Sequence, residues 1–118
     1  MIKLTLKAIA LMSLTAIGAT EAQAHAQLDH ASPAVGSTVG SSPGQVTLYF
    51  TQKLEPKFSG ADVKNSSGAR VDAGSSASGS SLHVGLKKLP AGTYTVHWHV
   101  LSVDTHKTQG SFSFHVSR

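Results

Sequence analysis

Apolar and polar residues alternate along much of the chain after residue 44, with the period of two that is typical of half-buried β-strands. The pattern is strongest near the C-terminus, where two alternating runs are separated by a polar loop. The apolar positions of these two runs are Tyr94, Val96, Trp98 and Val100, followed by Phe112, Phe114 and Val116. They predict two strands joined as a hairpin, with Asp104, Thr105 and His106 in the connecting loop.

Shorter strands are predicted before this hairpin. Residues 45–51 and 82–86 alternate in the same way, and residues 61–64 and 69–72 are extended pieces on either side of a turn at 65–68. The run 74–81 is almost wholly Gly, Ser and Ala, so we expect a mobile loop there. Six or seven short strands with frequent turns, and no helical periodicity after the first 24 residues, predict an all-β fold, a single Greek-key β-sandwich.

The first 24 residues have a different character. Lys3 and Lys7 precede an apolar run at 8–19, and small residues at Ala22 and Ala24 follow it. This is the pattern of a helical secretory signal peptide, cleaved after Ala24. The alternative is a membrane anchor, but the run is about a dozen residues, whereas a spanning helix needs about 20. We therefore expect a signal peptide at 1–24, an exported domain at 25–118, and no stable membrane insertion after cleavage.

Composition narrows the function further. Loss of Lys3, Lys7 and Glu21 with the signal peptide would lower the net charge from +4 to +3. The remaining basic residues are scattered, so we expect no nucleic-acid partner. The chain has no Cys, which excludes disulfides, zinc-thiolate sites and blue-copper sites.

A metal site is predicted where two parts of the sequence would meet. Cleavage after Ala24 would make His25 the first residue, so that its α-amine and its imidazole could chelate one ion. Asp104 and His106 are two residues apart in a segment that we expect to be extended, so their side chains would point the same way. Together these groups supply four nitrogen and oxygen donors, which is the set that Cu(II) prefers. We therefore predict one Cu(II) per chain, bound by His25, Asp104 and His106.

The other potential ligands are less informative. His30, His83 and His115 are expected to be solvated side chains of a polar segment or an exposed strand face. His97 and His99 share one face, so a weak second copper or zinc site is possible there. The two methionines, Met1 and Met12, lie in the signal peptide, so we expect no Cu(I) site built from thioethers.

Two blocks of residues, one at each end of the predicted domain, carry a family resemblance. The first consists of His25 to Leu28, Ser32, Pro33, Ala34, Gly36, Val46 to Phe50, Glu55, Pro56, Phe58 and Ser59. The second consists of Leu89, Pro90, Gly92, Tyr94, Val96, Trp98, Val100, Ser102, Asp104, His106, Gly110, Phe112 and Phe114. Together they resemble the CopC family of periplasmic copper-binding proteins. The resemblance implies an immunoglobulin-like or cupredoxin-like sandwich that holds Cu(II) in the periplasm, with the ligand roles falling on His25, Asp104 and His106.

The chain departs from the family pattern at two positions near this site. Thr105 stands between the two loop ligands where the family usually has Gly, so we expect that the loop does not need a conformation restricted to glycine. Gln52 stands where relatives often have an acid, which could lower copper affinity through the surroundings of the ligands.

Three functions are compatible with these features. The first is a non-catalytic copper carrier or buffer in copper resistance or homeostasis, with an inner-membrane copper importer or another copper-handling protein as its partner. The second is a copper mono-oxygenase, since such enzymes also use an N-terminal histidine together with a second histidine. The third is a plain β-sandwich interaction module. The small domain, the missing aromatic platform and the Asp104 carboxylate in a position that oxygen would need favour the carrier.

Overall fold

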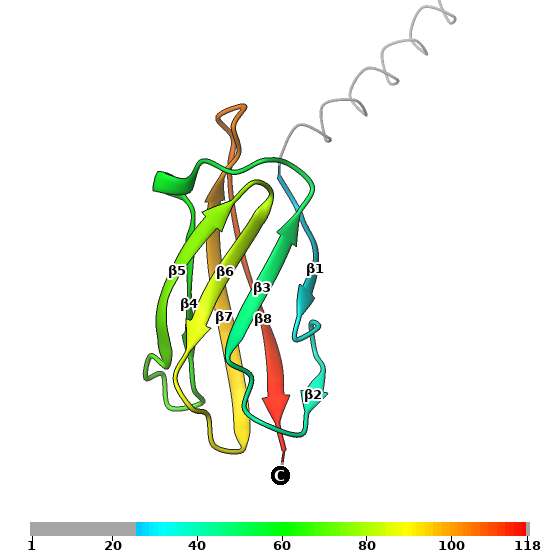
Figure 1. Ribbon diagram of the computed structural model, residues 1–118, viewed down its shortest axis with the longest axis vertical. Coiled ribbons are helices and arrows are strands. Elements are labelled where there is room, and N and C mark those ends of the chain that lie inside the picture. Colours follow the sequence, from blue (N-terminus) through cyan, green and yellow to red (C-terminus); the bar gives the residue numbers. More distant parts are fainter. Residues whose placement is uncertain (1–25, 118) are drawn as a thin grey trace, which may run out of the picture.

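The alternating segments form paired strands in the computed structural model, which describes residues 26–117 (Figure 1). The strands are β1 (Leu28–Ser32), β2 (Thr38–Val39), β3 (Gln45–Phe50), β4 (Gly60–Lys64), β5 (Asp72–Ser78), β6 (Ser81–Leu86), β7 (Gly92–Leu101) and β8 (Lys107–Val116). A single turn of 3-10 helix, η1 (Pro56–Phe58), precedes β4. The expected signal peptide and His25 lie outside the described residues.

The strands form two four-stranded sheets, in the orders β1-β3-β6-β5 and β2-β8-β7-β4. The two sheets lie face to face as two layers (Figure 1). Strand β2 runs parallel to β8, whereas the other paired strands are antiparallel. The predicted all-β sandwich is therefore confirmed. Within residues 26–117, no helix is long and apolar enough to cross a membrane.

The predicted C-terminal hairpin is the longest strand pair of the sandwich. Its register runs from Gly92 opposite Val116 to Leu101 opposite Lys107. The apolar face of this hairpin packs against the other sheet; its buried side chains are Tyr94, Val96, Val100, Phe112, Phe114 and Val116. Trp98 is half-buried in the same row and meets the ring of Phe50 edge-on, with the ring centroids 5.1 Å apart. The period of two thus sets which residues form the core.

The prediction of a mobile loop at residues 74–81 is wrong. Residues 72–78 form the edge strand β5, which pairs with β6 from Asp72 opposite Leu86 to Ser78 opposite Ser81. A turn at Gly79, with φ of 62°, completes this hairpin. Backbone hydrogen bonds to β6 need no apolar side chain on β5, so this strand carries no alternation in the sequence.

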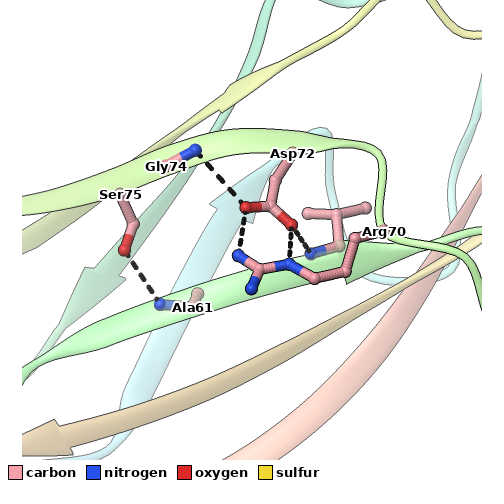
Figure 2. A network of polar contacts seen from close by, with 6 residues as sticks. Ala61, Arg70, Asp72, Gly74 and Ser75 are labelled. Atoms are coloured by element: carbon pink, nitrogen blue, oxygen red, sulfur yellow. Dashed lines mark hydrogen bonds and ion pairs between the residues drawn. The ribbon is translucent and has the colours of Figure 1, made fainter.

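Side chains of β5 also cover the free edge of β4 in the opposite sheet. The Ser75 hydroxyl accepts a hydrogen bond from Ala61 N–H at 3.1 Å, and Asp72 Oδ1 accepts one from Val63 N–H at 2.9 Å (Figure 2). Arg70 donates to both carboxylate oxygens of Asp72, at 3.1 and 2.7 Å. Unpaired N–H groups on an edge strand would otherwise be open to pairing with another chain.

Strands β1 and β2 were not among the predicted elements. In β1 only Ala31 is buried, and a cis peptide bond between Ser32 and Pro33 follows at its end. Backbone pairing with β3 holds β1 in place, with Leu28 opposite Phe50 and Ser32 opposite Thr47. The beginning of β1 lies at the same end of the sandwich as the loop between β7 and β8 (Figure 1).

Candidate metal centre

The loop between β7 and β8 is folded around one buried hydroxyl, that of Ser102. This residue is fully buried, and its N–H donates to the His106 carbonyl at 3.0 Å. Its carbonyl accepts a hydrogen bond from Thr105 N–H at 2.8 Å, which closes a tight turn. The side-chain hydroxyl contacts the Asp104 carboxylate and the backbone of His106. Sequence reasoning included Ser102 only in the family resemblance and gave it no structural role, although Ser and Asp are both common turn residues.

The structure brings the two predicted loop ligands together. The Nδ1 atom of His106 lies 3.3 Å from Oδ1 of Asp104, and both side chains are about two-fifths exposed. Two donors with metal bonds of about 2.0 Å are about 2.8 Å apart at the 90° angle of a square and about 3.3 Å apart at the angle of a tetrahedron. The spacing of this pair therefore fits two neighbouring positions around one ion.

The electrostatics of the loop favour the ionised carboxylate. The hydrogen bond from Ser102 is the largest cause that lowers the pKa of Asp104, and His106 lowers this pKa further. Partial burial of the carboxyl raises the pKa, but this effect is smaller than the combined lowering by the hydrogen bonds and His106. Asp104 is therefore ready at neutral pH to supply one negative charge to a cation.

The backbone between the two ligands differs from both expectations for this segment. The segment is a turn rather than an extended piece, and Thr105 has φ of 72°. This is the left-handed region, which favours glycine and is unfavourable for a β-branched residue. The expectation that the loop does not need a glycine-type conformation is therefore wrong, and Thr105 adopts it at a cost. Its hydroxyl donates to the Asp104 carbonyl at 2.5 Å.

The third predicted ligand, His25, lies outside the described residues, but its neighbour in sequence is firmly held. Ala26 is fully buried, and its carbonyl accepts a hydrogen bond from the Thr108 hydroxyl at 2.9 Å. Thr108 lies two residues beyond His106, at the base of the loop between β7 and β8, which we call the metal loop because it carries the two predicted ligands. The next residue is also fixed, because Gln27 N–H donates to the Thr51 hydroxyl at 2.9 Å. The chain after His25 is thus anchored beside the two loop ligands.

Other metal ligands are scarce in the described part of the chain. Residues 26–117 contain no Cys and no Met, and no group of three or more His, Asp or Glu side chains in this range is placed to hold an ion. His97 and His99 are both on the outer face of β7, but they belong to no such group within the described residues. His115 donates or accepts a hydrogen bond with Thr93, and His30 stacks on Tyr49. The loop pair alone supplies one nitrogen and one oxygen donor, which is too few for tight binding.

Comparisons with known proteins point to one family. The family model described as the CopC domain matches residues 28–117. Protein YobA of Escherichia coli (strain K12) is 42% identical over 98 residues, which cover 79% of each chain. Copper resistance protein C of Xanthomonas campestris pv. juglandis is 38% identical over 115 residues, covering 89% of this chain and 90% of the relative. The crystal structure of CopC from Methylosinus trichosporium OB3b matches with a TM-score of 0.75 at 32% identity, covering 79% of this chain and 94% of that one.

Proposed function

The chain belongs to the CopC family, and from that premise we propose that it is an exported carrier or buffer of Cu(II) in copper resistance or homeostasis. It acts in the periplasm, after removal of residues 1–24, and carries one ion per chain. Its role is to hold copper and pass it on, without catalysis. The copper donor or acceptor is another copper-handling protein, such as an importer of the inner membrane.

One observation carries this proposal: the Asp104–His106 pair, with 3.3 Å between its donor atoms, lies beside the anchored residue that follows His25. Consecutive Cα atoms are about 3.8 Å apart, so a chain beginning at His25 extends only one residue beyond buried Ala26. The Ala26 carbonyl is in turn bound by Thr108, two residues beyond His106, so the mature N-terminus would begin close to the loop in sequence and in space. This placement supports a site shared between the mature N-terminus and the loop.

The donor set determines the preferred oxidation state. The amine and imidazole of His25, the imidazole of His106 and the carboxylate of Asp104 are nitrogen and oxygen donors, which suit Cu(II) in a tetragonal array. The carboxylate also neutralises one charge of the ion. Cu(I) prefers soft sulfur ligands, and residues 25–118 contain none. Reduction should therefore release the copper: ascorbate with a soft Cu(I) chelator should strip the protein, whereas a moderate Cu(II) competitor should not.

The decisive experiment is a competition titration of Cu(II) with the processed protein, whose intact mass must correspond to a start at His25. His106→Ala should lower the affinity more than about 100-fold, because even residues that only orient a ligand typically contribute 10- to 100-fold. Ser102→Ala, which removes such an orienting contact, should cost about 10- to 100-fold. His115→Ala is the matched control, since this histidine lies at the other end of the hairpin, opposite Thr93.

The N-terminal ligand has its own test. A variant with one extra residue before His25 should fold normally but lose Cu(II) affinity by orders of magnitude, because the amine and the imidazole no longer chelate together. A product cleaved after Ala26 should lose both donors. Equal affinity of the extended and processed proteins would show that the amine is not a ligand. Turnover with ascorbate and peroxide would instead support a mono-oxygenase, and binding no tighter than micromolar would support a plain interaction module.

A further inference from the structure

The end of the sandwich that carries the metal loop also exposes apolar side chains. Phe58 is 62% exposed and Val103 is 49% exposed, and they are two of the three large apolar side chains that are strongly exposed within residues 26–117. Backbone hydrogen bonds bring their segments together: Val103 N–H donates to the Lys53 carbonyl at 3.0 Å, and Glu55 N–H donates to the Leu101 carbonyl at 2.8 Å. The segment leading into η1 therefore runs alongside the metal loop.

A groove of about 610 Å³ lies between η1 and the outer face of the β7–β8 hairpin. It is lined by Lys57, Phe58, His99, Val100, Lys107, Thr108 and Gln109. These lining residues include two lysines and no acid. Lys107 directly follows the predicted ligand His106 in the sequence, so the lining of the groove begins one residue from the Asp104–His106 pair.

Exposed lysines lie on the same segments as these apolar side chains. We define the loop-end patch as Phe58 and Val103 together with the exposed lysines 53, 57 and 107. Of the acids at this end, half-buried Glu55 and the predicted ligand Asp104 lie on the segments that carry the patch, and exposed Asp29 lies apart from them at the start of β1. A bound Cu(II) would offset the charge of Asp104 and add positive charge, so the loaded protein would be more cationic here than the empty one. An exposed aromatic residue at the centre and charged residues at the rim are typical of protein interfaces.

We propose that the loop-end patch is the docking surface for an acidic segment, carrying an apolar side chain, of the protein that exchanges copper with the Asp104–His106 pair. The apolar side chain would enter the groove beside Phe58, and the acidic groups would meet the lysine rim. Because loading with Cu(II) adds positive charge, the partner would bind the loaded form more tightly than the empty form. This inference rests on the proposed function and names the chemistry of its partner.

Other occupants fit the patch less well. A small anion would pair with the lysines but would leave Phe58 and Val103 in water. A second copy of the chain, related by a two-fold axis, would place the same three lysines against each other, and like charges across an interface are unfavourable. An acidic protein segment satisfies both the apolar centre and the cationic rim.

The test measures transfer of Cu(II) by stopped flow from the loaded protein to two synthetic acceptor peptides. Both peptides carry the same Cu(II)-chelating amino-terminal head; one has an acidic tail with a phenylalanine, and the other has a neutral polar tail. At low salt, transfer to the acidic peptide should be at least about 10-fold faster, and the difference should shrink at high salt. The double variant Lys53→Glu/Lys57→Glu, and separately Phe58→Ser, should remove most of this advantage.

The matched control is Lys87→Glu/Lys88→Glu, which reverses two lysines at the opposite end of the sandwich and should keep the advantage. None of these variants alters a proposed ligand, and the uncharged change Phe58→Ser should keep equilibrium Cu(II) affinity within about twofold. The Cu(II) affinity of each charge-reversal variant is measured first, so that a change in transfer rate is not mistaken for a change in binding. If the wild-type protein holds Cu(II) tightly but transfers it equally fast to both peptides, the docking surface is refuted and the carrier function stands. Failure to hold Cu(II) at all would refute the carrier function itself. Dimerisation that the patch variants abolish would show that the occupant of the patch is a second copy of the chain and would refute the acidic partner. Binding to vesicles of phosphatidylglycerol and phosphatidylethanolamine that the same variants abolish would show that the occupant is a membrane.

Discussion

Replacement of Asp72 by asparagine should weaken the contact between the two sheets in a way that depends on pH. The Asp72 side chain is fully buried and lies on β5, where it accepts hydrogen bonds from Val63 N–H of β4 and from Gly74 N–H (Figure 2). It also forms an ion pair of 2.7 Å with Arg70. The Arg70 hydrogen bond is the largest cause that lowers the pKa of Asp72 from 3.8 to about 2, although burial of the carboxyl opposes this shift.

The shift gives the magnitude of the effect. At 1.36 kcal/mol per pKa unit, a value of about 2 instead of 3.8 means that the ionised carboxylate contributes about 2 kcal/mol to folding at neutral pH. Because the pKa is lower in the folded state, this contribution is complete above the unfolded value and disappears as the pH falls from about 4 to about 2. The side-chain NH2 group of the new asparagine would also face the N–H donors that now bind the carboxylate, and this unpaired contact adds about 1 kcal/mol to the loss of stability. Asp72→Asn should therefore cost about 2 to 3 kcal/mol at pH 7.

Urea unfolding followed by the fluorescence of Trp98, the one tryptophan of the chain, measures this difference. The gap between the wild type and Asp72→Asn should shrink by about 1 kcal/mol between pH 7 and pH 3, because protonation removes the same charge from the wild type. Asp29→Asn is the matched control: its ion pair with His30 is also 2.7 Å long, but Asp29 is 63% exposed. Exposed pairs contribute little, so this variant should stay within about 0.5 kcal/mol. A gap for Asp72→Asn that is the same at both pH values would refute the electrostatic explanation.

Three further predictions concern the metal loop and its support. Thr105→Gly should raise the free energy of unfolding by about 0.5 to 1 kcal/mol in urea titrations. A φ of 72° costs a threonine about 1 to 2 kcal/mol, and the greater flexibility of glycine in the unfolded chain offsets part of the stability gained by removing this cost. A loss of stability would contradict this. Gly110→Ala should destabilise the protein by about 1 to 3 kcal/mol and shift the fluorescence emission of Trp98, because the new Cβ would lie 2.5 Å from Trp98 Cζ2. Gly40→Ala is the control and should leave stability unchanged, because there is open space around Gly40. The hydrogen bond from Ser102 and the nearby His106 lower the pKa of Asp104, so this carboxyl stays ionised in the weakly acidic range where the nitrogen ligands become protonated. The slope of log Cu(II) affinity against pH should therefore report only nitrogen ligands, and Asp104→Asn should lower the affinity without changing this slope.

Much of the sandwich could be predicted because its core strands alternate. Val46 and Leu48 of β3, and Val96 and Val100 of β7, are buried as the period of two requires. Strand β5 could not be predicted in this way, because its position depends on the backbone of β6 and on the Ser75 and Asp72 contacts to β4. Those interactions join residues that are not neighbours in the sequence, and Gly and Ser residues on β5 give no local sign of them.

The candidate site was predictable to a similar degree. The spacing of Asp104 and His106 correctly predicted that their side chains would meet, and the structure places the donor atoms 3.3 Å apart. The reason given for it, an extended backbone, was wrong, because the pair converges through a turn with Thr105 in the left-handed region. The two-residue spacing is compatible with both geometries, so the sequence alone did not decide between them. The role of His25 stays a prediction.

Ser102 explains why the turn holds its shape. Its hydroxyl is buried and contacts both the Asp104 carboxylate and the His106 backbone, so one side chain sets the positions of both predicted ligands. A pair held in this way before the metal arrives loses little conformational freedom on binding, which favours affinity. The same hydrogen bond lowers the pKa of Asp104, so it favours the charge of the site as well as its geometry. A serine has this effect only when the fold buries it at the end of β7, and for that reason its residue type alone did not identify it.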